Sequence, residues 1–374
     1  MQGGFLAQAL LARDETLCLY GSGGPKMKAA GVDLRIETTH FSSVGVLEAV
    51  RFIVPLRRVL QRLQSIIRAD RPDAAILIDN HGFNLMLAKF LKEEKIPVIY
   101  YFPPQAWIAS GVFAGAIVRN TQLIISSFVQ EAAIYRGHGG RAVSLGHPLL
   151  DIVKPGPNPM AVLTQLGLDA SRPLMALMPG SRGQELERLA GPMFGAATII
   201  KRSIPGMQFL LPVASPHLRS RLEEIHQQVG CTEEIHYLDA DVYTCLSRCH
   251  LVMTTTGTST LEAALLGVPM VTAYRVHPLS ALLGRMFAST RYVAMPNLLL
   301  EEFVVPEILQ REVTANRLAQ AALEILASPS RQATMRARFR ELPGMLGEEG
   351  VLDRVAELVL NEVSARCEPC ESSK

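Results

Sequence analysis

Several features that would define a class of protein are missing from this sequence of 374 residues. No apolar run approaches the roughly 20 residues that cross a bilayer. The first residues, MQGGFLAQALLARDE, lack the basic segment and cleavage site of a signal peptide. Lys and Arg number 37 against 35 Asp and Glu, so no overall positive field indicates a protein that coats duplexes. The sequence therefore predicts a soluble cytoplasmic protein whose basic surfaces are local.

The cysteines also lack the pattern of a disulfide framework. They are Cys18, Cys231, Cys245, Cys249, Cys367 and Cys370. The spacing of Cys367-Glu-Pro-Cys370 suits a metal or redox site, but no second pair lies nearby and the stretch is a polar tail. We predict no metal site and no cofactor.

Short β-rich runs alternate with helical periodicity along most of the chain, which is typical of parallel sheets with crossover helices. Strands are expected at 16–20, 74–79, 98–103, 123–128, 143–146, 174–178, 208–213, 234–238, 251–255 and 270–274. Helices are expected at 4–12, 185–201 and 259–266, among others. The pattern predicts an α/β protein with two doubly wound, Rossmann-like domains that face a cleft, where ligands lie beyond the carboxyl ends of the strands.

A break at Lys154-Pro-Gly-Pro-Asn-Pro159 divides this pattern, because three prolines and a glycine preclude regular structure. We expect an N-terminal domain at 1–153 and a C-terminal domain at 154–374. The last helix, at about 350–364, is expected to pack back on the N-terminal domain. The chain opens with a helix, whereas a doubly wound domain normally opens with the central strand of its sheet.

The stretch Leu177-Met-Pro-Gly-Ser-Arg-Gly-Gln-Glu185 follows a strand and opens a helix. Gly180 permits a tight turn, the next amides and Ser181 can donate hydrogen bonds, and Arg182 places a cation at a helix N-terminus. The stretch predicts a diphosphate site. An ordinary turn with a Ser cap and a solvated Arg is the alternative.

Thr254-Thr-Thr-Gly-Thr-Ser-Thr-Leu-Glu262 follows the same logic in the same domain. Gly257 would let a ligand approach the backbone between hydroxyl side chains, and Glu262 can accept two hydrogen bonds from a ribose diol. A Thr-rich capping turn is the alternative. Two such turns at one sheet edge favour a nucleoside diphosphate.

The first domain offers weaker signals. Gly23 and Gly24 lie in a glycine turn after a strand, where a sugar or phosphate could approach. Asp79-Asn-His-Gly-Phe-Asn84 ends an apolar strand, so Asp79 and His81 are the candidate bases. A helix-capping Asp79 with a surface His81 is the alternative.

Residues 51–72 contain six Arg, and from Leu56 onward the apolar residues recur at helical spacing. This amphipathic helix could lie on an anionic membrane, where each basic residue contributes on the order of 1 kcal/mol. A core helix with a solvated basic side is the alternative. Nucleic acid is not expected, because no Tyr or Trp is interleaved for stacking.

Five stretches in order resemble the lipid-A-disaccharide synthase family of inverting GT-B glycosyltransferases. They are Leu177 to Arg182, Thr256-Gly-Thr-Ser-Thr-Leu-Glu-Ala-Ala-Leu-Leu-Gly-Val-Pro269, Ala273-Tyr-Arg-Val276, Tyr292-Val-Ala-Met-Pro-Asn-Leu298 and Val305-Pro-Glu-Ile-Leu-Gln310. A looser similarity extends through Gly23-Gly-Pro25, Val44-Gly-Val-Leu-Glu48, Pro104-Gln-Ala-Trp107 and Gly146-His-Pro148.

The resemblance implies transfer of 2,3-diacylglucosamine from its UDP donor to 2,3-diacylglucosamine 1-phosphate (lipid X), without a metal, on the inner face of the cytoplasmic membrane. A homodimer is left open. The expected donor side comprises Gly180, Ser181, Arg182, Glu185, Gly257, Thr258, Ser259, Thr260, Glu262, Arg275 and Asn297. The expected acceptor and membrane side comprises Gly23, Gly24, Glu48, Arg57, Arg58, Arg62, Asn84 and Trp107.

The chain departs from the family at two places. The family motif Asp-x-Pro-Asp-Phe-Asn has Gly82 at its second Asp, which looks like the general base, so adjacent His81 is the substitute, with an unperturbed pKa of about 6.5. The family also begins with a strand and a Gly-Glu-x-Ser-Gly-Asp turn that would precede Met1. We therefore expect the N-terminal sheet to lack a central strand, as a start placed too late would produce.

Two alternatives to this reaction follow from Gly82. A related transferase could use the same donor and a different lipid acceptor. A non-catalytic relative could bind lipid and nucleotide without turnover. The intact donor-side stretches favour the transferase.

Overall fold

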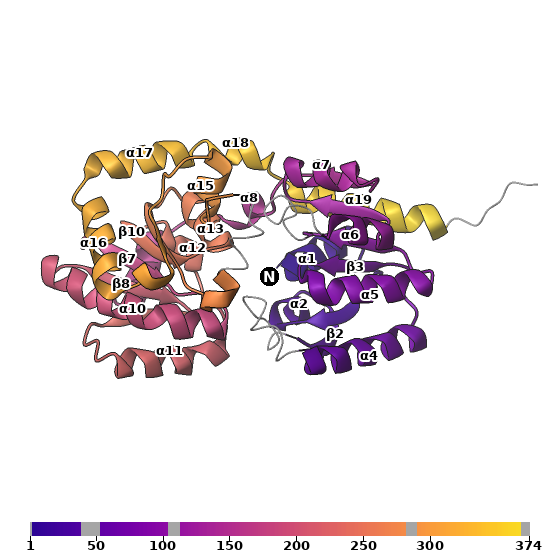
Figure 1. Ribbon diagram of the computed structural model, residues 1–374, viewed down its shortest axis with the longest axis horizontal. Helices are drawn as coiled ribbons and strands as arrows, with labels where there is room; N and C mark the ends of the chain where they lie inside the picture. The colour runs from indigo at the N-terminus through magenta and orange to yellow at the C-terminus, as the bar shows by residue number, and fades with distance from the viewer. Residues whose placement is uncertain (1, 39–52, 104–112, 282–289, 368–374) are drawn as a thin grey trace, which may run out of the picture.

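The computed structural model describes residues 2–38, 53–103, 113–281 and 290–367, which form two lobes that lie side by side (Figure 1). The N-terminal lobe comprises the described residues up to 152 together with helix α19. The C-terminal lobe comprises those of 159–346. Parallel strands alternate with helices in both, so the predicted α/β class is confirmed.

The N-terminal lobe contains two separate parallel sheets. One pairs β1 (Tyr20–Gly23) with β2 (Asp33–Glu37). The other has the order β3-β4-β5-β6, formed by β3 (Ala75–Ile78), β4 (Val98–Tyr101), β5 (Leu123–Ser126) and β6 (Ala142–Ser144). Every residue of β4 and β5 is buried, whereas every residue of β1 is only partly buried. No described strand pairs with the second edge of β1 or of β3.

The C-terminal lobe is built on one parallel sheet of six strands in the order β12-β11-β10-β7-β8-β9. The strands are β7 (Leu174–Met178), β8 (Gln208–Pro212), β9 (Ile235–Leu238), β10 (Leu251–Thr255), β11 (Met270–Tyr274) and β12 (Glu307–Leu309). From β7 the chain proceeds to one edge, and from β10 it proceeds to the other. The strand order therefore reverses between β7 and β10.

Helices cover these sheets. In the N-terminal lobe they are α1 (Gln2–Arg13), α2 (Pro25–Ala29), α4 (Ile53–Ala69), α5 (His81–Glu93), α6 (Ala114–Asn120), α7 (Val129–Gly137) and α8 (Leu149–Ile152). The predicted amphipathic helix is α4: Leu60, Leu63 and Ile67 are buried in the core of this lobe, beside Leu91 of α5. The core-facing alternative therefore accounts for its apolar side.

The helices of the C-terminal lobe include α10, which at 21 residues is longer than any described helix of the N-terminal lobe. They are α9 (Pro159–Gln165), α10 (Gly183–Ser203), α11 (Pro216–Gln228), α12 (Val242–Leu246), α13 (Thr258–Leu265), α15 (Met295–Leu300), the 3₁₀ turn η2 (Gln310–Glu312), α16 (Ala315–Leu326), α17 (Pro329–Phe339) and α18 (Leu342–Leu346). α10 packs against α16 and α11, and α13 packs against β10, β11 and α15. Among the described residues, no helix combines the length and apolar character needed to cross a membrane.

Three strands differ from the sequence prediction. β1 begins at Tyr20, where the predicted strand ends, because the glycine-rich stretch Tyr20–Gly23 pairs with β2 and the mostly apolar residues before it do not form part of the strand. β2 and β12 were not predicted. β2 alternates exposed charged residues with Leu34 and Ile36, which is the pattern of a short edge strand.

The last helix, α19 (Val351–Cys367), lies against the N-terminal lobe (Figure 1). It packs on α1, and Arg141, directly before β6, forms an ion pair with Glu362 of α19, with Nη1 at 2.8 Å from Oε2. One apolar cluster continues from the six-stranded sheet through Leu346 and Val351 to the strands β4 and β5. The chain thus crosses between the lobes twice, at 153–158 and at 347–350.

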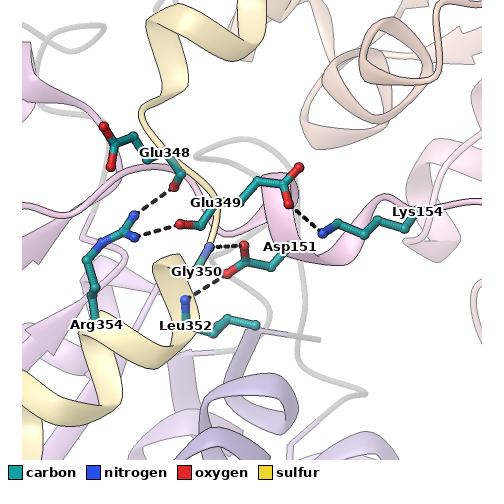
Figure 2. A network of polar contacts seen from close by, with 7 residues as sticks. All are labelled: Asp151, Lys154, Glu348, Glu349, Gly350, Leu352 and Arg354. Carbon is teal, nitrogen blue, oxygen red and sulfur yellow. Dashed lines mark hydrogen bonds and ion pairs between the residues drawn. The ribbon is translucent and has the colours of Figure 1, made fainter.

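Polar contacts join these two crossings (Figure 2). The Asp151 carboxylate accepts hydrogen bonds from the backbone N–H groups of Gly350 (2.6 Å) and Leu352 (2.8 Å), which are orphan donors at the start of α19. The Arg354 guanidinium donates to the carbonyls of Leu145 (3.0 Å) and Glu348 (2.7 Å). Both crossings are therefore fixed to each other by charge-assisted hydrogen bonds.

We predict that Asp151→Ala lowers the free energy of unfolding by about 1.5 kcal/mol, because it removes both caps of α19. Lys154→Ala is the matched control at the same junction. Its ion pair with Glu349 is solvent-exposed on both sides, so the expected change is at most about 0.5 kcal/mol. Urea unfolding followed by circular dichroism measures both. Equal losses in the two variants would contradict the capping role.

Candidate active site

The reversal of strand order in the C-terminal lobe brings two predicted turns together. β7 and β10 are hydrogen-bonded neighbours, with Met178 opposite Thr254. The turn after β7 leads into α10, and the turn after β10 leads into α13. Two helix N-termini therefore lie side by side beyond the carboxyl ends of adjacent strands, which is the usual ligand position in a doubly wound sheet.

The turn after β7 requires a glycine for two reasons. Gly180 has φ +131°, and a Cβ added there would lie 2.3 Å from Oε2 of Glu185. The Glu185 carboxylate accepts hydrogen bonds from the backbone N–H of Ser181 (2.9 Å) and of Arg182 (3.2 Å). The side chain of Glu185 is thus folded under the turn.

This arrangement differs from the expected diphosphate cradle. The amides of Ser181 and Arg182, which the sequence assigned to a ligand, bind an internal carboxylate instead. The Arg182 guanidinium also contacts Glu185, with Nη1 3.0 Å from Oε1, and the Arg182 side chain remains 39% exposed. Glu185 therefore orients the turn and Arg182 rather than presenting itself to a ligand.

The turn after β10 has an open backbone. Gly257 has φ +110°, and no atom lies within 4 Å of a Cβ added there. Most of the nearby hydroxyls point inward: Thr260 donates to the Gly257 carbonyl, and Ser259 donates to that of Thr255. Contrary to expectation, these hydroxyls do not surround a ligand position. They hold the turn so that its backbone is presented at the start of α13.

Glu262 lies one turn into α13 and is almost fully buried, at 8% exposure. Burial raises the pKa of its carboxyl group, and this is opposed by the hydrogen bond from the Thr258 hydroxyl, by the charge of Lys26 and by the hydrogen bond from the Tyr243 hydroxyl. Tyr243 belongs to α12 and Lys26 to the N-terminal lobe. Sequence reasoning found neither residue, because no local pattern links them to Glu262.

The Lys26 interaction shows which parts of the two lobes face each other. Lys26 follows Gly23, which ends β1, and Gly24, which precedes α2. Its charge acts on Glu262 of the other lobe. The glycine turn predicted in the first domain is thus linked to the turn after β10 by an electrostatic interaction between the lobes.

Two further donor-side candidates differ in their exposure to solvent. Arg275 follows β11 and is exposed. Asn297 is fully buried: its amide donates to Val305 O (2.7 Å) and to Glu307 Oε1 (2.9 Å), and its Oδ1 accepts from Val305 N (2.8 Å). Each polar atom of the Asn297 side chain is thus used inside the protein, so it fixes α15 to β12 rather than lining the turns.

Asp79 follows β3 and is exposed, with φ +52°. Its carbonyl accepts hydrogen bonds from Asn84 Nδ2 (2.7 Å) and from the Tyr100 hydroxyl (2.8 Å). Asn84 is buried, so it holds the backbone of the turn and does not face a substrate. His81 is the first residue of α5, and its side chain lies outside the described part of the structure.

The remaining candidates divide into two groups. Arg57, Arg58 and Arg62 are exposed on α4. Glu48 and Trp107 lie outside the described residues, as does Cys370. Within the described ranges no cluster of His, Cys, Asp or Glu has the arrangement of a metal site.

Comparisons with known proteins place these features in a family context. A family model described as lipid-A-disaccharide synthetase matches residues 1–351. The lipid-A-disaccharide synthase of Synechocystis sp. is 35% identical, covering 96% of this chain and 94% of the relative. That of Geobacter metallireducens is 34% identical, covering 96% and 93%.

Solved structures show a similar fold. The S. aureus MnaA–UDP structure has a TM-score of 0.66 at 11% identity, covering 100% of this chain and 97% of that chain. The UDP-GlcNAc 2-epimerase from Neisseria meningitidis bound to UDP-GlcNAc has a TM-score of 0.63 at 10% identity, covering 97% of each. The predicted GT-B-like architecture is confirmed at the level of the fold.

We predict that Gly180→Ala destabilises the C-terminal lobe by at least about 2 kcal/mol, because it combines a positive φ with displacement of Glu185. Gly183→Ala is the matched control: no atom lies within 4 Å of its added Cβ, and we expect a change within about 1 kcal/mol. Urea denaturation measures both. A Gly180→Ala variant as stable as Gly183→Ala would contradict the described turn.

Proposed function

Because the chain belongs to the lipid-A-disaccharide synthase family, we infer that it is a glycosyltransferase that forms the lipid A disaccharide from a UDP-linked sugar. The reaction moves 2,3-diacylglucosamine to the 6-hydroxyl of 2,3-diacylglucosamine 1-phosphate. A bond forms between that oxygen and the anomeric carbon, and the bond from this carbon to the UDP oxygen breaks. The hydroxyl proton passes to a base, and UDP leaves with the electron pair.

The observation that carries this proposal is the juxtaposition of the turns after β7 and β10. UDP requires donors for its diphosphate and an acceptor for its ribose. The partly exposed guanidinium of Arg182 and the open backbone at Gly257, Thr258 and Ser259 supply the donors, and Glu262 supplies the acceptor. Two helix N-termini add partial positive charge beside the same phosphates.

In this proposal Arg182 acts on the leaving group. Negative charge grows on the phosphate oxygen as the bond to the sugar breaks, and a guanidinium held in place stabilises that charge more in the transition state than in the ground state. The ion pair with Glu185 limits the rotation of Arg182 before the donor arrives. Arg275, exposed after β11, is placed at the rim of the same sheet edge.

Asp79 and His81 are proposed to remove the acceptor proton. They lie at the carboxyl end of β3, and the turn there is held through the Asp79 carbonyl by Asn84 and Tyr100. The exposed carboxylate of Asp79, or the imidazole of His81, can accept a proton without the second Asp of the family motif, whose place Gly82 takes.

We also propose that α4 lies on an anionic membrane. Arg57, Arg58 and Arg62 are exposed, and Val54 near the start of the helix is 61% exposed. Both substrates carry acyl chains, so they are delivered from a bilayer. A basic helix surface beside an exposed apolar residue is the arrangement of a peripheral protein.

We predict that Arg182→Ala lowers kcat/KM at least about 100-fold while the protein stays folded, because it removes the cation that stabilises the departing UDP. UDP release from the two lipid substrates is the measurement. Arg221→Ala is the control. Arg221 lies on α11, and its guanidinium binds the exposed Glu187 of α10, the helix that Arg182 precedes. Unchanged UDP release in Arg182→Ala, or an equal loss in Arg221→Ala, would contradict the assignment.

We predict that replacing Arg57, Arg58 and Arg62 together by Ala weakens binding to vesicles of phosphatidylglycerol about 100-fold, at about 1 kcal/mol per residue. Co-sedimentation measures the partition. Replacing exposed Arg311, Arg317 and Arg340 of the other lobe by Ala removes the same charge and serves as control. Equal weakening in both triple variants would show a general charge effect instead of a membrane-binding helix.

A further inference from the structure

The turn between β3 and α5 has a strained backbone. Asp79 and Asn80 both adopt positive φ, at +52° and +36°, and neither is a glycine. The left-handed region is unfavourable for a residue with a side chain, and it persists only where the surrounding structure imposes it. Two such residues in succession therefore indicate a turn whose shape is set by its neighbours.

Strand β4 and helix α5 supply the groups that set this shape. The backbone N–H of Asp79 donates to the Phe102 carbonyl at 3.1 Å. The Asp79 carbonyl accepts hydrogen bonds from the Tyr100 hydroxyl (2.8 Å) and from Asn84 Nδ2 (2.7 Å), so both of its lone pairs are used. The peptide groups on both sides of the Asp79 Cα are thus fixed. The direction in which the Asp79 side chain leaves the backbone is fixed with them.

Two consecutive tyrosines of β4 differ in the use of their hydroxyls. Tyr100 is 2% exposed and packs in the apolar cluster that contains Phe83 and Leu87 of α5. Tyr101 is 1% exposed and belongs to the other large apolar cluster, because successive strand residues point to opposite faces of a sheet. In the described part of the chain the Tyr101 hydroxyl has no hydrogen-bond partner. Of the two buried hydroxyls, only that of Tyr100 bonds to the turn.

The side chain of Asp79 is exposed, although its backbone is held on both sides. Such a carboxylate can meet a substrate at the mouth of the sheet, and its reach is set by the turn beneath it. A catalytic group must be held within about 0.5 Å of its productive position, and a displacement of about 1 Å can cost about 100-fold in rate. The groups that hold the turn therefore bear on turnover.

We propose that Tyr100 is a positioning residue for the glycosyl transfer: its hydrogen bond to the Asp79 carbonyl holds the left-handed turn so that the Asp79 carboxylate meets the acceptor hydroxyl. The inference rests on the proposed function, in which Asp79 removes the acceptor proton. It assigns a role in turnover, rather than in substrate binding, to a buried residue that touches no substrate.

The test measures kcat and KM for UDP release from the two lipid substrates. Tyr100→Phe is expected to lower kcat at least about tenfold and to leave KM for each substrate within about twofold, because a displaced base slows proton removal without changing substrate contacts. Circular dichroism at the assay temperature verifies that the variant is folded.

A double variant separates positioning of Asp79 from a general structural effect. Asp79→Asn removes the base and keeps a residue that tolerates positive φ. General base catalysis contributes about 10²–10⁴-fold, so a radiolabelled donor can measure the residual rate. In this background Tyr100→Phe is expected to lower kcat less than about twofold, because the hydroxyl acts only through Asp79.

Two further variants are matched to Tyr100→Phe. Tyr101→Phe removes the neighbouring buried hydroxyl, which has no partner among the described residues, and is expected to leave kcat and KM within about twofold of the wild type. Asn84→Ala removes the second donor to the Asp79 carbonyl. It is expected to lower kcat as Tyr100→Phe does, and it tests the held turn even if Tyr100→Phe does not fold.

The outcomes are distinct. Unchanged kcat in Tyr100→Phe, an equal loss in Tyr101→Phe, a change in KM alone, or a full loss that persists in the Asp79→Asn background would overturn the positioning role while leaving the reaction intact. Wild-type protein that releases no UDP, or an Asp79→Asn variant as fast as the wild type, would overturn the proposed function or its base.

Discussion

The pairing of β7 with β10 is the constraint on which the rest of the site depends. Parallel neighbours place their carboxyl ends together, and the strand order reverses between β7 and β10, which is where doubly wound sheets bind ligands. Gly180 and Gly257 both adopt positive φ at this point, so the chain can leave each strand and enter α10 or α13 at once. Because both helix N-termini meet there, an anion finds donors from two elements.

Internal polar groups already determine much of the electrostatics of this region. The Glu185 carboxylate accepts hydrogen bonds from the backbone amide of Ser181 and from the Arg182 guanidinium. The second contact orients Arg182 and leaves other N–H donors of its guanidinium for a ligand. Burial raises the pKa of the Glu262 carboxyl group, and the charge of Lys26 in the other lobe opposes this shift. The contacts of Asp151 and Arg354 join the two chain crossings, so these two residues help to fix the relative position of the lobes.

The sequence predicted most of the strands, the turns of the C-terminal lobe and the amphipathic helix, because each has a local pattern of apolar residues, glycine or arginine. It did not predict β1 correctly, since a glycine-rich strand forms through pairing rather than propensity. The influence of Tyr243 and Lys26 on the pKa of Glu262 comes from the tertiary fold, which no sequence spacing encodes. The family resemblance suggested Asn297 as a donor-side residue, yet the structure shows that its polar side-chain atoms form hydrogen bonds within the core.

Hydrogen exchange with and without UDP tests the central claim most directly, because the claim concerns backbone amides as well as side chains. We expect UDP to slow exchange in peptides that cover 179–186 and 255–262 and to leave peptides from β9 and α11 unchanged. Protection confined to the N-terminal lobe, or no protection at saturating UDP, would contradict a nucleotide site at the junction of β7 and β10.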